Sequence, residues 1–157
     1  MPSPSRSTGR RAFAGAVAGV DAAAAFAAVM EVDRRLFKRD TDDLVLLGRF
    51  VSAQRTQARA AGLGIHLANG VILGGFYGVA LHEVLPGAPM MRGVIFANAE
   101  NLILYPLALL ENYHPAIRDG EIGGYWNGTA FIQEVLRHVV FGAILGDGTE
   151  RILQSDR

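Results

Sequence analysis

The sequence predicts an all-α protein, a four-helix transmembrane bundle built from two parallel helix-pair repeats. Half of its 157 residues are hydrophobic and only 19% are charged, a composition apolar enough for several membrane spans. Residues 60–82 form a run of 23 without a formal charge, and as a helix such a run crosses about 30 Å of hydrocarbon. The segment 66–74 (HLANGVILG) returns in altered form as 138–146 (HVVFGAILG). This similarity predicts an internal repeat.

The first long helix is expected over residues 12–36, after a tail. Residues 1–11 contain Pro, Ser and three Arg, and we expect them to be disordered. The Ala-rich run that follows is similar to a signal peptide, but Asp21 interrupts it, so we expect an uncleaved helix. Gly15 and Gly19 lie four residues apart, a spacing that allows another helix to approach closely.

A short helix on the membrane surface is expected between the first and second long helices. Residues 33–59 are rich in charge, but positions 44–51 hold an apolar cluster beside Arg49 and Arg55. This pattern is typical of a helix that lies in the membrane interface. The second long helix is expected over residues 60–85, because the sequence Pro-Gly-Ala-Pro that follows would stop it.

The third and fourth long helices are expected over residues 91–112 and 125–145. The fourth begins at Tyr125-Trp126, aromatic residues that are typical of a membrane interface. Each pair of helices returns the chain to its starting side, so the two halves are expected to be parallel repeats related by an axis along the membrane normal. The predicted parts of the chain are a disordered N-terminal tail, a membrane domain and a polar C-terminal tail: residues 1–11, 12–146 and 147–157.

Charge and cysteine content exclude several classes of function. The chain has 15 basic and 15 acidic residues, whereas a protein that binds nucleic acid needs a basic surplus for phosphate contacts. It has no cysteine, which excludes disulfide bonds, thiolate zinc sites and a cysteine nucleophile. The expected partner is the lipid bilayer. Glycines that recur at four-residue spacing along the helices would also allow two copies of the chain to pack closely, so a homo-oligomer is possible as well. We expect no enzymatic activity.

Polar and ionisable side chains are expected to gather near one membrane face. A charge in lipid costs at least about 2.5–3.5 kcal/mol, so charged groups in a span usually face the bundle interior and pair there. Glu134 lies three residues before Arg137 and four before His138, which places all three on one helix face. A carboxylate beside an imidazole can hold its tautomer or raise its pKa. The predicted polar cluster comprises Glu31, His66, Asn69, Glu111, Glu134, Arg137 and His138.

Three roles for this polar cluster remain open from the residues alone. Its members can fix the packing of four helices by satisfying one another, or they can form a proton relay or a small-ligand pocket. His66 and His138 can instead ligate haem iron, or a transition metal together with a glutamate. We assign no cofactor, because the sequence supplies no further ligands. Glu111 and His114 have the spacing of soluble di-iron bundles, but such a site needs that motif twice.

A second polar pair and a set of packing glycines are expected deeper in the bundle. Counting from the helix starts places Asp21 and Glu100 at comparable depth near the midplane, with Asn98 and Asn101 beside Glu100. A hydrogen bond shared between these groups would hold the first and third helices together. The glycines expected to pack helices are Gly15, Gly19, Gly70, Gly74, Gly78, Gly142 and Gly146.

Several short motifs follow one another in an order that is characteristic of one family. They are His-x-x-x-Gly at 66–70, Phe-Tyr-Gly at 76–78, Glu-Val-Leu-Pro at 83–86, Tyr-Pro at 105–106 and Gln-Glu-Val-Leu-Arg-His-Val-Val-Phe at 133–141. Together they resemble the YagU-like family of bacterial inner-membrane proteins, over residues 12–146. The chain differs in a shorter first loop without cysteines and in Arg137, where that family has a glycine. The resemblance implies a four-helix integral membrane protein of the bacterial inner membrane and no assigned reaction.

The leading hypothesis is therefore a multi-pass membrane protein with a buried Glu/His/Arg cluster that is proton-linked or binds a small ligand. The first alternative is a four-helix membrane protein that binds haem or a metal through His66 and His138. The second alternative is a soluble helical bundle, which the many charges and the short apolar core of the fourth helix suggest.

Overall fold

The computed structural model describes residues 4–37 and 40–155, and every regular element in these two ranges is helical. The predicted all-α class is therefore confirmed. The elements are α1 (Pro4–Phe37), α2 (Asp43–Gly48), α3 (Arg55–Phe76), the π-helical turn η1 (Tyr77–Leu81), α4 (Pro89–Leu104), the 3-10 helix η2 (Tyr105–Tyr113), α5 (Pro115–Arg118) and α6 (Gly128–Ser155).

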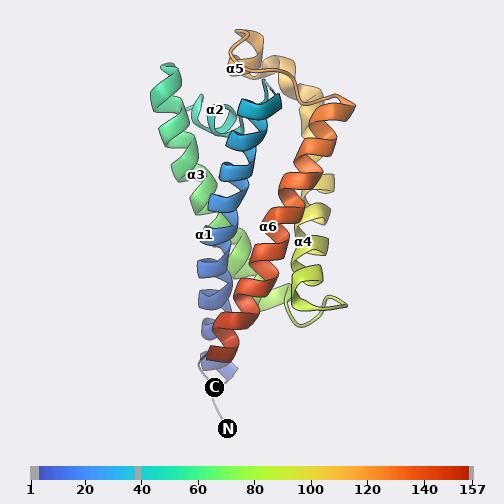
Figure 1. Ribbon diagram of the computed structural model, residues 1–157. Helices are drawn as coiled ribbons and strands as arrows, with labels where there is room; N and C mark the ends of the chain where they lie inside the picture. Colours follow the sequence, from blue (N-terminus) through green and yellow to red (C-terminus); the bar gives the residue numbers. More distant parts are fainter. Residues whose placement is uncertain (1–3, 38–39, 156–157) are drawn as a thin grey trace.

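Four helical segments in the described residues are long and apolar enough to cross a membrane. They run up and down, so that both ends of the described chain lie at the same end of the bundle, while α2 and α5 lie at the opposite end (Figure 1). The prediction of four apolar helices is confirmed, and the length and composition of these helices indicate a membrane protein. The four segments are Ser7–Phe37, Arg55–Leu81, Pro89–Tyr113 and Gly128–Ser155.

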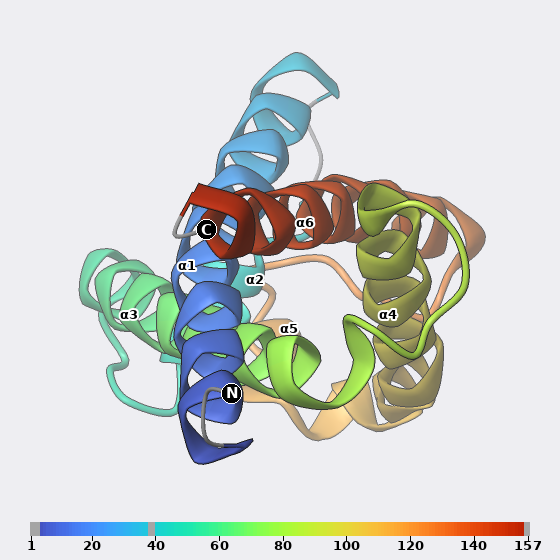
Figure 2. The same cartoon turned by 90° about the horizontal axis from the view of Figure 1, so that it is seen from below.

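The helices do not form a closed square bundle. Helix α1 packs against α3 and α6, and α6 packs against α4. Helices α3 and α4 therefore lie on opposite sides of the α1–α6 pair, as Figure 2 shows. They are connected at the end near the termini, where η1, which continues α3, contacts α4. This arrangement leaves space between α3 and α4 toward the other end of the molecule.

Glycine allows α1 and α3 to approach at backbone distance. A Cβ atom added to Gly15 would collide with the backbone of Gly74, and one added to Gly19 would collide with the backbone of Gly70. Gly78 faces the backbone of α1 in the same way, one turn farther along. The five glycines predicted to pack in α1, α3 and η1 thus all lie where α1 meets the other two segments, and any side chain there would force them apart.

Helices α4 and α6 pack by the same means. Gly142 lies against the backbone of Gly93, and Gly146 lies against the backbone of Pro89. The sequence analysis assigned Gly142 and Gly146 to packing but missed Gly93, because Gly93 has no second glycine at four-residue spacing in its own helix. Both hairpins, α1 with α3 and α4 with α6, are therefore joined through small residues.

The first and last long helices of the chain extend beyond their predicted ends. Helix α1 begins at Pro4 and α6 continues to Ser155, so the described residues 4–11 and 147–155 are helical; the expected disorder of the N-terminal tail is corrected for residues 4–11. The Nη2 of Arg10 donates a hydrogen bond to the Leu153 carbonyl (2.5 Å). The extensions therefore support each other, and no proline or glycine pair interrupts either of them. The remaining residues of both predicted tails lie outside the described residues.

Two of the predicted long helices change type near their ends. The helix expected over 91–112 is α-helical only to Leu104 and continues as 3-10 helix. Pro106 explains the change, because proline has no N–H to donate and its ring clashes with the preceding turn. The helix expected over 60–85 begins earlier, at Arg55, and its last described turn is π-helical, closed by the hydrogen bond from His82 N–H to the Tyr77 carbonyl (2.8 Å).

A short helix lies between α1 and α3, at the position predicted for an interfacial helix. The Asp42 carboxylate caps α2 by accepting a hydrogen bond from the Val45 N–H (3.3 Å). Leu44 and Val45 are buried, and Gly48 lies against the backbone of Ala58 in α3. Helix α2 is thus packed against the bundle and covers its end.

Candidate functional site

A cavity of about 740 Å³ occupies the space between α3 and α4. Helices α1 and α6 form its inner wall, and α2, η2 and α5 close it at the end away from the termini. Most of its surface is apolar, with contributions from Phe26, Leu73, Leu104 and Phe141. Polar side chains interrupt this surface at several places, among them those of His66, Asn69, Glu100, Asn101, Glu134 and His138.

One ionisable pair in the cavity wall joins α4 and α6. His138 Nε2 lies 3.3 Å from a carboxylate oxygen of Glu100, and His138 Nδ1 lies 2.7 Å from the Glu134 carbonyl oxygen. Because a carbonyl oxygen only accepts, Nδ1 must carry a hydrogen. The contact between Glu100 and His138 therefore joins α4 to α6 in the cavity wall.

His66 and His138 both lie beside the ring of Phe26. The Phe26 ring contacts both imidazoles, with centroid distances of 5.0 Å to His66 and 5.1 Å to His138. His66 Nε2 donates to the Ala23 carbonyl of α1 (3.1 Å). Since both nitrogens of His138 also have partners within the protein, the pair is not placed to ligate a haem iron from two sides. Among the described residues, no group of three or more His, Cys, Asp or Glu side chains could hold a metal ion.

Asn101 is the most unusual polar residue of the cavity wall. Its side chain is 5% exposed, yet its Nδ2 has no hydrogen-bond partner among the described residues. An amide donor that is buried without an acceptor costs free energy, of the order of 1–3 kcal/mol. Asn101 is one of the residues that line the cavity, but its Nδ2 atom is itself buried beneath the cavity surface.

Arg137 is the centre of a buried ion network beside the cavity. Its side chain is 1% exposed and contacts three carboxylates, on Asp33 of α1 (2.9 Å), Asp43 of α2 (3.3 Å) and Glu134 of its own helix (2.7 Å). The Tyr125 hydroxyl donates to Asp43 (2.6 Å), and burial together with this carboxylate raises the pKa of Tyr125 well above its usual value. One guanidinium thus ties three helices together.

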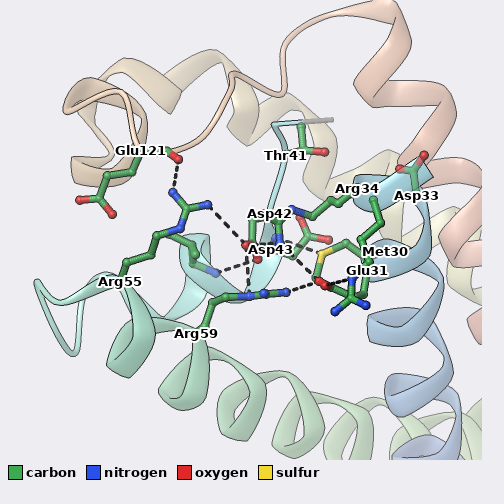
Figure 3. Close-up of polar contacts among 12 residues, drawn as sticks. Met30, Glu31, Asp33, Arg34, Thr41, Asp42, Asp43, Arg55, Arg59 and Glu121 are labelled. Carbon is green, nitrogen blue, oxygen red and sulfur yellow. Dashed lines mark hydrogen bonds and ion pairs between the residues drawn. The ribbon is translucent and has the colours of Figure 1, made fainter. Parts of the chain in front are cut away.

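A second ion network joins Asp42, at the start of α2, to arginines of α1 and α3 (Figure 3). The buried Asp42 carboxylate lies 2.8 Å from Arg34 and 3.2 Å from Arg59. Glu31 binds Arg59 (2.6 Å) and also Arg35 (2.7 Å). The neighbouring aspartates at the start of α2 therefore face different networks, since Asp42 binds arginines of α1 and α3 while Asp43 binds Arg137 of α6.

The structure divides the predicted polar cluster into separate groups. Glu134, Arg137 and His138 lie together as expected, and His66 and Asn69 share the cavity with them. Glu31 does not join them, because it belongs to the outer arginine network. Glu111 does not join them either, because it lies at the far end of the cavity. Its carboxylate accepts hydrogen bonds from the N–H groups of Tyr125 and Trp126 and so holds the loop before α6.

The predicted midplane pair of Asp21 and Glu100 is corrected. Asp21 is exposed on the outer face of α1, and Glu100 binds His138 instead. The two residues were matched by depth, but each residue of a helix turns its side chain by 100°, so depth alone does not decide which neighbour a side chain faces.

Several important polar residues were missed by the sequence analysis. Asp33, Asp42 and Asp43 were read as part of a charged surface segment, although the arginines close to them in the sequence, such as Arg34 and Arg39, were a signal for ion pairing. His82 was also missed: it is 2% exposed, with Nε2 2.9 Å from Glu150 and Nδ1 3.3 Å from the Tyr77 hydroxyl. This group ties η1 to α6 near the termini.

The chain was compared with known families, curated proteins and solved structures. A family of unknown function (DUF6789) matches residues 9–157. Neither a curated protein nor a solved structure matches the chain. The protein therefore belongs to the DUF6789 family.

Proposed function

We propose that this DUF6789 member is a bacterial inner-membrane protein that binds a small, largely apolar molecule in the cavity between α3 and α4. The observation that carries the proposal is the cavity itself, a space of about 740 Å³ with mainly apolar walls and a few polar groups. Binding sites for small molecules in proteins commonly have this size and this composition.

The position of the cavity supports entry from the bilayer. Helices α3 and α4 lie apart at the level of the cavity, and their outer surfaces carry exposed apolar side chains such as Ile72 and Ile103. Exposed apolar side chains on spanning helices are in contact with lipid chains. A lipid-soluble molecule can therefore reach the cavity from the side without crossing the charged end of the bundle.

The polar groups support a proton-linked form of binding. The ionisable side chains of Glu100 and His138 contact each other in the cavity wall, where a bound molecule would meet both. A haem site is a weaker proposal, because both nitrogens of His138 already have partners.

Four finer predictions from the sequence remain proposals. They are a relation to the YagU-like family, two parallel helix-pair repeats, a membrane-interface position for α2 and assembly into a homo-oligomer. The glycine packing within each hairpin supports the repeat, and the short charged segment around α2 supports the interface position.

Photolabelling tests the proposed function directly. The protein in lipid nanodiscs is exposed to an alkyl probe that carries a diazirine group, and the labelled residues are mapped by mass spectrometry. Bilayer lipids reach the exposed helix faces, whereas Phe26 and Phe141 are buried and line the cavity. We expect labelling at Phe26 or Phe141. Labelling confined to exposed faces would contradict the proposal.

A cavity-filling variant provides the control. Ala108 lines the cavity and Leu109, its neighbour in η2, is exposed and does not. We expect Ala108→Trp to abolish labelling at the buried wall, because the indole occupies the space of the probe. Leu109→Trp places the same side chain on the outer face and is expected to leave that labelling unchanged.

A further inference from the structure

Asp21 lies at the centre of the apolar part of α1. Between Arg11 and Glu31 the sequence has 19 residues, and Asp21 is the only one with a formal charge, with nine residues on each side. As a helix, such a segment is roughly 28 Å long, close to the thickness of the hydrocarbon layer of a bilayer. Asp21 therefore lies near the middle of the bilayer when α1 crosses it.

The Asp21 carboxyl group has no partner within the molecule. The side chain is exposed on the outer face of α1, and among residues 4–37 and 40–155 no other residue forms a hydrogen bond or an ion pair with its carboxyl group. On a spanning helix an exposed side chain meets lipid, and acidic residues are rare in that position because lipid chains offer nothing to pair with them. Asp21 thus requires a partner group that another polypeptide supplies.

The residues around Asp21 form a seam that suits a second helix. The face of α1 that α3 and α6 leave exposed carries Val17, Asp21, Ala24 and Ala28, which follow one another at spacings of four, three and four residues. These are the spacings of the contact positions in two helices that pack side by side, where a single polar residue fixes the register of a parallel pair. Ala24 and Ala28 are small, so the backbone of the second helix can approach closely.

We propose that two copies of the chain dimerise in the membrane through this seam, with their Asp21 carboxyl groups hydrogen-bonded to each other across a two-fold axis along the membrane normal. Copies inserted in the same orientation bring Asp21 to the same depth, so the second copy supplies a carboxyl group where one is required. Two carboxyl groups held together share one proton, because the protonated group donates and the carboxylate accepts.

The seam is distinct from the glycine contacts of the same helix. Gly15 and Gly19 already lie against the backbone of α3, so they are not free to join two copies. The inference rests on the membrane placement in the proposed function and not on the cavity. It names the surface and the central residue of the proposed homo-oligomer.

Cysteine cross-linking in membranes tests the seam, because the chain has no cysteine of its own. Ala24→Cys places a thiol on the seam, and mild oxidation is expected to join two copies by a disulfide bond. Ala68→Cys is the matched control, because Ala68 is exposed on α3 and lies near the depth of Asp21, since Gly70 faces Gly19. The control is expected to migrate as a monomer on a denaturing gel.

Two substitutions of Asp21 test the hydrogen bond. Asp21→Leu removes it, and the dissociation constant of the dimer, measured by sedimentation equilibrium in detergent micelles, is expected to rise about 5- to 30-fold, the effect of one hydrogen bond between membrane helices. Asp21→Asn keeps a donor and an acceptor in one side chain and is expected to preserve the dimer. Because Asp21 is exposed, both variants should retain the helical circular dichroism of the unmodified chain.

The outcomes separate this inference from the proposed function. A chain that requires detergent for extraction but is monomeric, equal cross-linking of Ala24→Cys and Ala68→Cys, or an unchanged dissociation constant for Asp21→Leu would overturn the inference. Cross-linking of Ala24→Cys to a different membrane protein would overturn it too, because the partner would not be a second copy. Recovery of the chain from the aqueous fraction without detergent would instead contradict the membrane placement in the proposed function.

Discussion

Replacement of Arg137 by methionine is the most severe single change that the structure predicts. The guanidinium is 1% exposed and contacts carboxylates of Asp33, Asp43 and Glu134 within 3.3 Å. Methionine has a similar length but no charge, so Arg137→Met leaves three acidic groups without their shared cation. Removing one partner of a buried ion pair typically costs about 3–5 kcal/mol.

This cost corresponds to a large shift in the folding equilibrium. A loss of about 3–5 kcal/mol lowers the ratio of folded to unfolded protein by roughly 150- to 5,000-fold. The measurement is unfolding in mixed micelles of a mild detergent with increasing dodecyl sulfate, followed by loss of helical circular dichroism. Arg118→Met is the control, because Arg118 and Asp119 form an exposed pair, and exposed pairs contribute about 0–1 kcal/mol.

A further pair of substitutions separates electrostatics from packing. If unpaired carboxylates cause the loss, adding Asp33→Asn and Glu134→Gln to Arg137→Met should recover part of the stability, because fewer buried charges remain. An Arg137→Met protein within about 1 kcal/mol of the unmodified chain would refute the claim that this guanidinium holds the helices together.

Three further predictions concern packing and pH. Gly74→Ala should destabilise the bundle by about 1–3 kcal/mol, because its Cβ would meet the backbone of α1, whereas Gly64→Ala in the same helix meets nothing within 4 Å and should stabilise the helix by about 0.5–1 kcal/mol; thermal unfolding in detergent distinguishes them. Burial lowers the pKa of His114, so the stability that it contributes is present above pH ~6.5 and is lost as the pH falls below that value; His114→Asn should weaken this acid dependence in unfolding curves and is contradicted by unchanged curves. The pKa of Tyr125 is raised, so stability should fall as the pH rises above ~10, and Tyr125→Phe should remove this alkaline loss when the two proteins are unfolded side by side.

The parts of the fold that follow from periodicity were predictable from the sequence. Long uncharged runs gave the spanning segments, and four-residue glycine spacing gave the contacts of Gly15 and Gly19 with α3. Both signals are local, because they depend on the composition of one helix and on the small size of one residue. The change from α-helix to 3-10 helix at Pro106 has an equally local cause. The sequence analysis used Tyr105-Pro106 only as part of a family motif and overlooked the effect of proline on the helix type.

The partners of the polar residues were not predictable in the same way. Glu31 and Glu134 were assigned to one group by their depth, yet Glu31 faces Arg59 of α3 and Glu134 faces Arg137. The difference arises from the rotation of each helix about its axis and from α2, which inserts Asp42 and Asp43 between the two groups. Neither the rotation nor the folding back of a six-residue helix can be read from apolar periodicity.

The distribution of polar groups along the bundle favours binding over conduction. The Glu100–His138 pair lies in the cavity wall, and His82 with Glu150 lies near the termini. Between them the buried core contains Phe96 and other apolar side chains packed between Tyr77 and the cavity. A proton or ion that crossed the protein would have to pass this apolar layer, at a cost that the polar groups on either side do not offset. A molecule that enters from the lipid and leaves by the same side meets no such layer.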